Sequence, residues 1–239
     1  MGKLCDRKTQ VLTLPAWDHR PALIHGFGDR LWREDCFDFD HELSALNRII
    51  LNQVHSDIIH VIKSPLGDRT EGDALITSVP GLLLTIKTAD CLPILLTDDT
   101  SSLVAAAHCG WRGTAHRLIT KLVQKIKTDL SAPASSLTAV MGPCIGSPCY
   151  EVGPEVRQAF LNAGLSLQPF YSNTASPDRF FLDLKAANRQ QMVNAGIPPS
   201  HIFSLGSCTH CDPAKISFRR NRSECGRMFS FIGLQKKRR

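Results

Sequence analysis

The chain has 239 residues, 43% of them hydrophobic and 21% charged, so it is long enough to bury a sizeable core. Its formal net charge is +6, but four of the positive charges belong to the last four residues, Lys236–Arg239. The remainder of the chain is close to neutral, which argues against a nucleic-acid-binding surface. We expect the terminal Lys-Lys-Arg-Arg to be a solvated tail.

No apolar run approaches the roughly 18 residues that a membrane helix needs. The first ten residues also lack the apolar core of a signal peptide. Nine cysteines are an odd number, so they cannot all pair within the chain. We therefore expect reduced thiols and a cytoplasmic location, where clustered Cys and His residues point to metal binding or catalysis.

Short apolar and β-branched runs predict strands along most of the chain. The first covers residues 22–28, and residues 49–62 hold two short strands on either side of the segment 52–56. Further strands are expected at 73–77, 82–86, 92–96, 103–107, 137–141 and 202–205.

Three helices are expected between these strands. The clearest covers residues 113–130, and its apolar positions fall on one face: Ala115, Leu118, Ile119, Leu122, Val123, Ile126 and Leu130. A second helix has Pro154 in its first turn and stops at Gly164. A third has Asp183 as its N-cap, ends at Gly196 and turns four residues inward: Leu184, Ala187, Met192 and Ala195.

Many strands and few helices, without strict alternation, favour an α+β fold over a doubly wound sheet. The chain contains no repeats, low-complexity tracts or linker-like stretches. We therefore expect a single domain that covers residues 1–239, and the sequence does not indicate its oligomeric state.

Three residues at the ends of predicted strands form a candidate metal site. His55, Cys91 and His108 each lie at a strand end or in the following turn, where a scaffold can hold them on one rim. Two imidazoles and one thiolate suit Zn²⁺ and leave a fourth position open, as in catalytic zinc sites. The alternative is one buried cysteine beside two hydrogen-bonded core histidines.

The segment His108-Cys-Gly-Trp-Arg-Gly113 is a candidate anion site at the start of the predicted helix. Its two glycines allow a ligand to approach the backbone, and the helix N–H groups attract negative charge. Arg112 can hold a phosphate or carboxylate with two hydrogen bonds. The alternative is a tight turn in which Arg112 pairs with a nearby Asp.

Three other segments are assigned structural roles. The Gly/Pro-rich loop 142–151 contains Cys144 and Cys149, whose spacing fits no common zinc pattern, so we expect it to border the site. The pair Cys208-x-x-Cys211 lacks a second such pair, and redox or zinc use is the less favoured alternative. The basic segment 218–228 is expected to be a solvated or salt-bridged strand, and a substrate contact is the less favoured alternative.

The assembled motifs resemble the laccase-domain family, also known as the polyphenol oxidase or purine nucleoside phosphorylase family, which includes a peptidoglycan editing factor. The matching motifs cover nearly the whole chain: Asn52–His55, Gly72–Thr77, Thr88–Pro93, His108–Gly113, Gly142–Gly146, Cys149–Val152, Asp183–Asn188, Cys208–Thr209, Ser217–Arg220 and Gly226–Met228. The chain departs from the pattern at Phe218, where Tyr or His is commoner.

The resemblance implies a mixed fold in α/β/β/α layers, with zinc bound by His55, Cys91 and His108. It also implies phosphorolysis of purine nucleosides (adenosine, inosine or methylthioadenosine) to the base and ribose 1-phosphate, with adenosine deamination as a further activity. The implied partners are therefore a nucleoside and phosphate, with no nucleic acid and no membrane. Together with Arg112, the three zinc ligands are the expected catalytic residues.

Three other functions remain open from the sequence. A copper-dependent polyphenol oxidase of the multinuclear kind needs His-x-His pairs, which this chain lacks, so Cu²⁺ is the second choice of metal. A metal-free hydrolase of a cell-wall precursor would use Cys91 as its nucleophile and His108 as its base. A non-enzymatic protein would use the site only to hold a metal.

Overall fold

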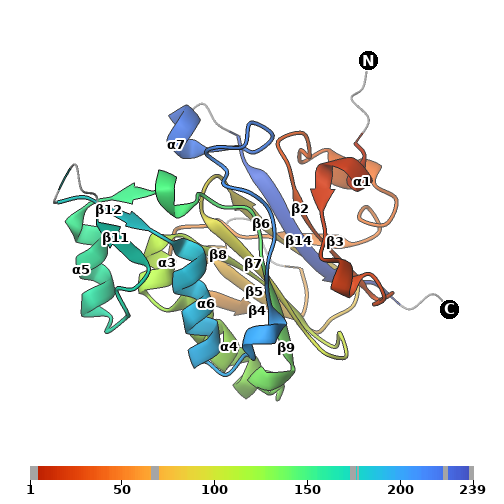
Figure 1. Cartoon of the computed structure of the whole chain (residues 1–239). Coiled ribbons are helices and arrows are strands. Elements are labelled where there is room, and N and C mark those ends of the chain that lie inside the picture. Colours follow the sequence, from red (N-terminus) through yellow and green to blue (C-terminus); the bar gives the residue numbers. More distant parts are fainter. Residues whose placement is uncertain (1–4, 66–69, 173–175, 177, 223–225, 237–239) are drawn as a thin grey trace.

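Two β-sheets pack face to face, and helical segments cover both outer faces (Figure 1). The computed structural model describes residues 5–65, 70–172, 176, 178–222 and 226–236. One sheet has the order β1-β2-β14-β6-β3, and the other has the order β13-β9-β7-β8-β5-β4. A small third sheet has the order β10-β12-β11. This arrangement confirms the α+β class and the expected layers.

The strands are short, and most are largely buried. The five-stranded sheet consists of β1 (Val11–Leu12), β2 (Leu23–Gly28), β14 (Met228–Leu234), β6 (Leu82–Thr88) and β3 (Asn47–Ile50). The six-stranded sheet consists of β13 (Ile202–Ser204), β9 (Leu137–Met141), β7 (Leu92–Asp98), β8 (Val104–Cys109), β5 (Ala74–Thr77) and β4 (Ile59–Val61). The small sheet consists of β10 (Glu151–Val152), β12 (Phe180–Leu182) and β11 (Phe170–Ser172).

Alternation along the central strands builds two cores at once, because successive side chains point to opposite faces of a sheet. On β7, Ile94 and Leu96 pack toward the helices, whereas Leu95 packs toward the other sheet. On β8, Ala105 and Ala107 face the helices, and Ala106 faces the other sheet. The six-stranded sheet is therefore buried on both faces.

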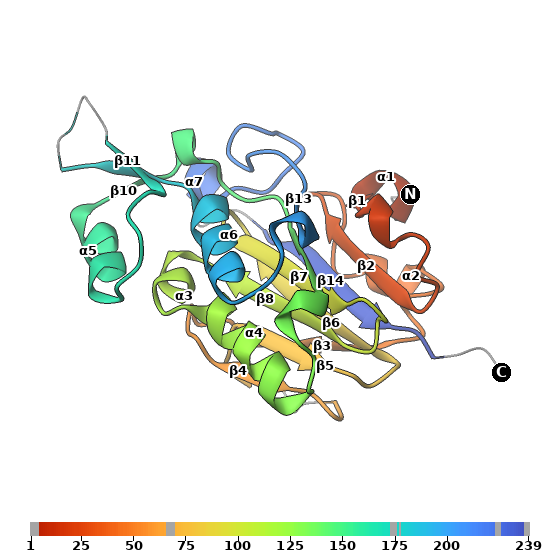
Figure 2. The same ribbon diagram turned by 60° about the horizontal axis from the view of Figure 1, so that its bottom comes forward.

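The larger helices are α3 (Trp111–Ala115), α4 (Leu118–Asp129), α5 (Pro154–Asn162) and α6 (Leu184–Asn194). Helices α3, α4 and α6 cover the outer face of the six-stranded sheet, whereas α5 lies beside the small sheet (Figure 2). The apolar stripe of α4 is buried as expected, and the Asp183 side chain caps α6 by accepting a hydrogen bond from the Ala186 amide. The short helices are α1 (Arg7–Gln10), α2 (Cys36–Phe39) and α7 (Phe218–Asn221), with 3₁₀ turns at Pro15–Trp17, Ala134–Ser136, Ser147–Cys149 and Pro199–His201.

The N-terminal segment covers the outer face of the five-stranded sheet. Trp32 and Phe37 pack there against Phe231 of β14. A disulfide joins Cys5 to Cys36, with their Cα atoms 5.3 Å apart. The expectation that the thiols are reduced is therefore wrong for this pair, because an odd count of cysteines excludes complete pairing but not a single disulfide.

The helix expected over residues 113–130 is two helices. Arg117 adopts a left-handed conformation with φ 59° and separates α3 from α4. The Gln191 side chain of α6 donates a hydrogen bond of 2.9 Å to the Thr114 carbonyl at this break. The Thr114 carbonyl also accepts a hydrogen bond of 3.0 Å from the Arg117 amide, so it is bonded both within the turn and to α6. Periodicity alone reveals neither the left-handed residue nor this tertiary contact.

The nine expected strands all form, but the sequence analysis missed β14, which lies between β2 and β6, and the short strands β1, β10, β11 and β12. The prediction of a basic strand over residues 218–228 is wrong in part. Phe218–Asn221 is helix α7, and the strand begins only at Met228. Residues 237–239 of the expected tail lie outside the described residues. Among the helices of the described part, none is long and apolar enough to cross a membrane.

The hairpin of β7 and β8 carries two of the candidate site residues at its open end. Its register pairs Leu92 with Cys109 and Pro93 with His108, which brings His108 beside the turn that holds Cys91. At the closed end, the buried Asp98 carboxylate accepts hydrogen bonds from the Thr100 and Ser102 side chains and from the Ser102 and Leu103 amides. Asp98 therefore fixes the turn that sets this register.

Replacing Asp98 by Ala should lower the free energy of unfolding by about 2 to 3 kcal/mol at pH 7, because it removes four hydrogen bonds to the carboxylate and leaves the buried Leu103 amide unsatisfied. Burial acts to raise the pKa of Asp98, but these hydrogen bonds outweigh it and hold the pKa below its usual range. The stabilisation is therefore present above about pH 4, the pKa of an unfolded Asp, and is lost as the pH falls through the lower folded pKa.

Denaturant unfolding of the wild type and of Asp98→Ala at several pH values measures this effect. Asp99→Ala is the matched control, because the neighbouring Asp99 is exposed and should change stability little. A stability difference between Asp98→Ala and the wild type that stays constant down to pH 2 would contradict the assignment.

Candidate functional site

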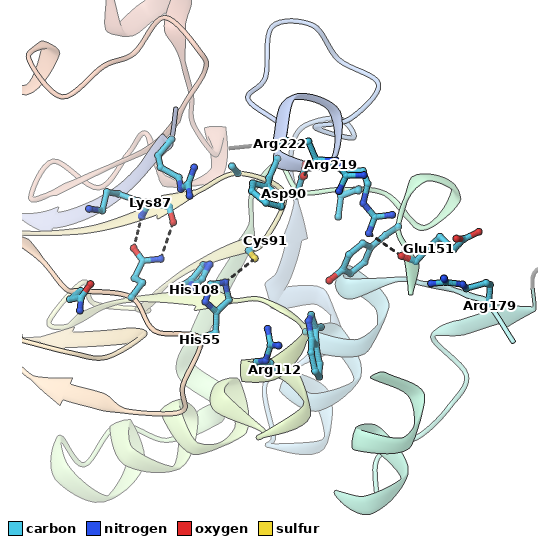
Figure 3. A pocket seen from close by; sticks show the side chains of 18 residues that line it. His55, Lys87, Asp90, Cys91, His108, Arg112, Glu151, Arg179, Arg219 and Arg222 are labelled. Atoms are coloured by element: carbon cyan, nitrogen blue, oxygen red, sulfur yellow. Dashed lines mark hydrogen bonds between the residues drawn. The ribbon is translucent and has the colours of Figure 1, made fainter. Parts of the chain in front are cut away.

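The structure brings His55, Cys91 and His108 together at one end of the two sheets (Figure 3). One potential ligand atom from each residue lies within 4.8 Å of the other two. His55 belongs to the loop between β3 and β4, Cys91 to the turn between β6 and β7, and His108 to β8. The three side chains thus come from segments that connect or belong to both sheets.

Asp73, just before β5, organises both histidines. Its carboxylate is fully buried and accepts hydrogen bonds from the amides of Val54, His55 and Ser56 at 3.3, 3.1 and 2.6 Å. The Ser56 hydroxyl adds a fourth bond of 2.7 Å. These contacts hold the loop in a turn in which His55 has a φ of 61°, a conformation that is uncommon outside glycine.

The same carboxylate orients the His108 ring. His108 Nδ1 lies 2.8 Å from Asp73 Oδ1, so Nε2 is the nitrogen left to face the site. Burial acts to lower the pKa of His108, but the negative charges of Cys91 and Asp73 and their hydrogen bonds outweigh it and raise the pKa. A histidine held in this way by a carboxylate is the usual arrangement of a metal-binding imidazole.

Cys91 follows a constrained turn. The preceding residue, Asp90, has a φ of 84°, and its carboxylate accepts hydrogen bonds from Thr209 Oγ1 at 2.5 Å and the Arg219 amide at 2.6 Å. The Cys91 sulfur lies 4.0 Å from His55 Nε2. Burial acts to raise the pKa of the Cys91 thiol, but the two histidines outweigh it and lower the pKa, which favours the thiolate.

Gly110 lets the backbone approach this cluster closely. A Cβ atom at Gly110 would lie 3.0 Å from the Cys91 sulfur and 3.2 Å from Cδ2 of His55. Both contacts are tighter than ordinary van der Waals contact, so the absence of a side chain at this position leaves room for the cluster.

A pocket of about 690 Å³ opens beside the three residues. Cationic side chains dominate its wall: Lys87, Arg112, Arg179, Arg219, Arg222 and Arg227. Two acidic residues, Asp90 and Glu151, also line it, together with the aromatic side chains of Trp111, Tyr150 and Phe218. The pocket therefore combines flat apolar surfaces with a strongly positive lining, which suits a ligand with a ring system and an anionic group.

Arg112 faces this pocket from α3, below the cluster in Figure 3. Its guanidinium lies 4.4 Å from the centre of the Trp111 ring, and it forms no ion pair within the described ranges. The alternative in which Arg112 pairs with a nearby Asp is therefore not observed. Because α3 has only five residues, the guanidinium rather than a long helix supplies the positive charge here.

The sequence analysis missed several residues of the site. In the sequence, Asp73 is only the first residue of a predicted strand. A carboxylate directly ahead of an apolar run was the one feature that could have pointed to it. Arg219 was assigned to a solvated strand, but it lies on α7, donates to the Glu151 carbonyl at 2.9 Å and lines the pocket. Cys149, Cys208 and Cys211, which were given structural roles, form a second sulfur cluster.

Comparison with known proteins agrees with the resemblance seen in the motifs. The family model described as multi-copper polyphenol oxidoreductase laccase matches residues 37–235. The purine nucleoside phosphorylase YlmD of Geobacillus stearothermophilus is 37% identical over 195 residues, which cover 77% of this chain and 71% of that protein. The adenosine deaminase RL5, from an unknown prokaryotic organism, is 37% identical over 161 residues, or 67% of this chain and 61% of RL5.

The fold is shared as well. The crystal structure of YlmD from Geobacillus stearothermophilus superposes with a TM-score of 0.85 at 29% identity, covering 95% of this chain and 97% of that one. The match of the family model over most of the chain, together with this relative, decides the assignment: the chain belongs to the multi-copper polyphenol oxidoreductase laccase family.

Proposed function

We propose that this protein is a zinc-dependent purine nucleoside phosphorylase, with adenosine deamination as a second reaction at the same site. The observation that carries the proposal is the open set of three donors, His55, Cys91 and His108, on the wall of a cation-lined pocket. The names of the relatives YlmD and RL5 support purine nucleosides as the substrate class.

The donor set fits zinc. Two imidazole nitrogens and one thiolate are preferred zinc ligands, and three protein ligands leave one position for a substrate or solvent. Asp73 holds His108 with one nitrogen toward the site, and Gly110 leaves space beside Cys91. Bound there, zinc would supply a Lewis acid that stabilises negative charge on an oxygen atom.

The protein's own groups would bind and orient the two substrates. Arg112 and Arg219 offer guanidinium groups to phosphate, and Trp111 and Tyr150 offer aromatic faces to the purine. In phosphorolysis a phosphate oxygen bonds to C1′ of the ribose while the bond from C1′ to the base breaks, and the base takes up a proton. Holding phosphate beside C1′ is therefore the main task of the cationic wall.

A second candidate is the metal-free hydrolase with Cys91 as nucleophile. The observation that favours it is the arrangement of three side chains in space. The Asp73 carboxylate orients His108, and His108 lies beside the Cys91 thiol, whose pKa is lowered. Removing metal with a chelator separates the two candidates. Inosine phosphorolysis that disappears on chelation and returns with added zinc supports the phosphorylase, whereas hydrolysis that survives chelation supports the thiol mechanism.

Replacing Cys91 by Ser should remove about one zinc per chain, because a neutral hydroxyl takes the place of a thiolate ligand. Elemental analysis of freshly purified protein gives the measurement. Cys109→Ala is the matched control. The Cys109 thiol is buried in the helix-facing core, and it belongs neither to the His55, Cys91 and His108 group nor to the cluster of Cys149, Cys208 and Cys211. Undiminished zinc in Cys91→Ser would exclude Cys91 as a ligand.

Replacing Arg112 by Ala should weaken the use of phosphate by about ten- to hundredfold, because a charge-assisted contact worth about 1.5 to 3 kcal/mol is lost. Initial rates of inosine cleavage at varied phosphate concentration measure this, and zinc content should stay unchanged. Arg33→Ala removes an exposed arginine that does not line the pocket and should have no effect. An unaltered phosphate dependence in Arg112→Ala would leave this residue with a structural role only.

A further inference from the structure

Three cysteines outside the candidate active site place their sulfur atoms together. Cys149 ends the 3₁₀ turn Ser147–Cys149, and Cys208 and Cys211 lie in the loop after β13. All three sulfurs lie within 4.8 Å of one another, and those of Cys149 and Cys211 are 3.3 Å apart. Two loops that are about 60 residues apart in the chain thus meet at one cluster of three sulfur atoms.

Backbone amides surround the Cys208 sulfur. The Gly146 amide donates a hydrogen bond of 3.1 Å to it, and the amides of His210 and Cys211 also interact with it. Such amide contacts orient the sulfur, as the outer contacts of metal-binding side chains do. The Cys-x-x-Cys spacing of Cys208 and Cys211 is also the spacing of many zinc-binding pairs.

The loops are held in place independently of the sulfurs. Cys144 and Cys208 form a parallel β-bridge, and the Thr209 amide donates to the Cys144 carbonyl at 3.0 Å. The Arg220 guanidinium donates to the carbonyls of Thr209 and His210, both at 2.8 Å. The three thiols are therefore presented by a preorganised frame, which lowers the cost of gathering them around an ion.

The spacing of the sulfurs is close to that of thiolates around one ion. Thiolates on a tetrahedral zinc ion, with bonds of about 2.3 Å, lie about 3.8 Å apart. The Cys149 and Cys211 sulfurs are 3.3 Å apart and the other two pairs lie within 4.8 Å, so small side-chain movements would bring all three to zinc-binding positions. Cys211 is exposed, so a fourth ligand can come from solvent.

We propose that Cys149, Cys208 and Cys211 bind a second zinc ion, separate from the one proposed at His55, Cys91 and His108. The ion would fasten together two segments that border the pocket. One segment continues from Cys149 into Tyr150 and Glu151 of the pocket wall. The other contains Thr209, whose hydroxyl bonds to Asp90 beside Cys91.

Zinc content per chain tests this proposal. In protein purified anaerobically without chelator, we expect about two zinc ions per chain in the wild type and about one in Cys211→Ser or Cys149→Ser. Cys144→Ser is the matched control, because Cys144 is a neighbouring buried thiol outside the cluster, and it should retain the wild-type content. Circular dichroism of each variant checks that the fold is intact.

The variant Cys91→Ser separates this proposal from the proposed function. If both sites hold zinc, Cys91→Ser and Cys211→Ser each lose about one ion, and the combined variant loses nearly all of it. In the Cys91→Ser background, cobalt should give an intense thiolate-to-metal absorption that disappears when Cys211 is also replaced. A loss of zinc in Cys211→Ser but not in Cys91→Ser would support the second site and contradict the first.

Two results would overturn the proposal. One is a Cys211→Ser variant that keeps the full zinc content of the wild type while folded. The other is a disulfide between Cys149 and Cys211, found by peptide mass spectrometry of the anaerobically purified wild type, because that bond would consume two of the three ligands.

Discussion

The geometry of the site depends on the hydrogen bonds that the buried carboxylate of Asp73 accepts. It bonds to three successive amides of the loop that carries His55 and to the ring of His108. A buried charge is tolerated only when such hydrogen bonds replace its water, so the loop and the ring are held in one arrangement. One side chain thereby sets the positions of two of the three candidate ligands.

The junction of the two sheets supplies the third ligand. Cys91 lies in the short connection between β6 of one sheet and β7 of the other, and the pairing of β7 with β8 brings it beside His108. Because both sheets are packed on a common core, this connection has little freedom to move. The candidate metal ligands therefore lie on the rim of a rigid sandwich, where a site can be open to a ligand and still be precise.

The charge of the pocket depends on the contacts of one of its two acidic residues, Asp90. The Asp90 carboxylate is already bonded to Thr209 and to the Arg219 amide, and this holds α7 and the loop after β13 against the Cys91 turn. The Arg219 side chain is thus brought to the wall by a backbone contact of α7, and the like charges of the wall favour an anionic ligand. The sulfur cluster adjoins the same two segments, so the wall and the cluster share one framework.

The sequence by itself determined the family, the α+β class, the nine strands that were expected and the three candidate metal residues, because alternation, capping and motif spacing are local signals. Tertiary structure alone decided the rest. Contacts between distant segments place Gln191 of α6 against the Thr114 carbonyl beside the helix break, Asp73 against a loop about 18 residues away, and Arg219 of α7 against the Cys91 turn. The convergence of Cys149 with the Cys208-x-x-Cys211 pair was likewise invisible, because about 60 residues separate Cys149 from that pair and only the fold places the two loops side by side.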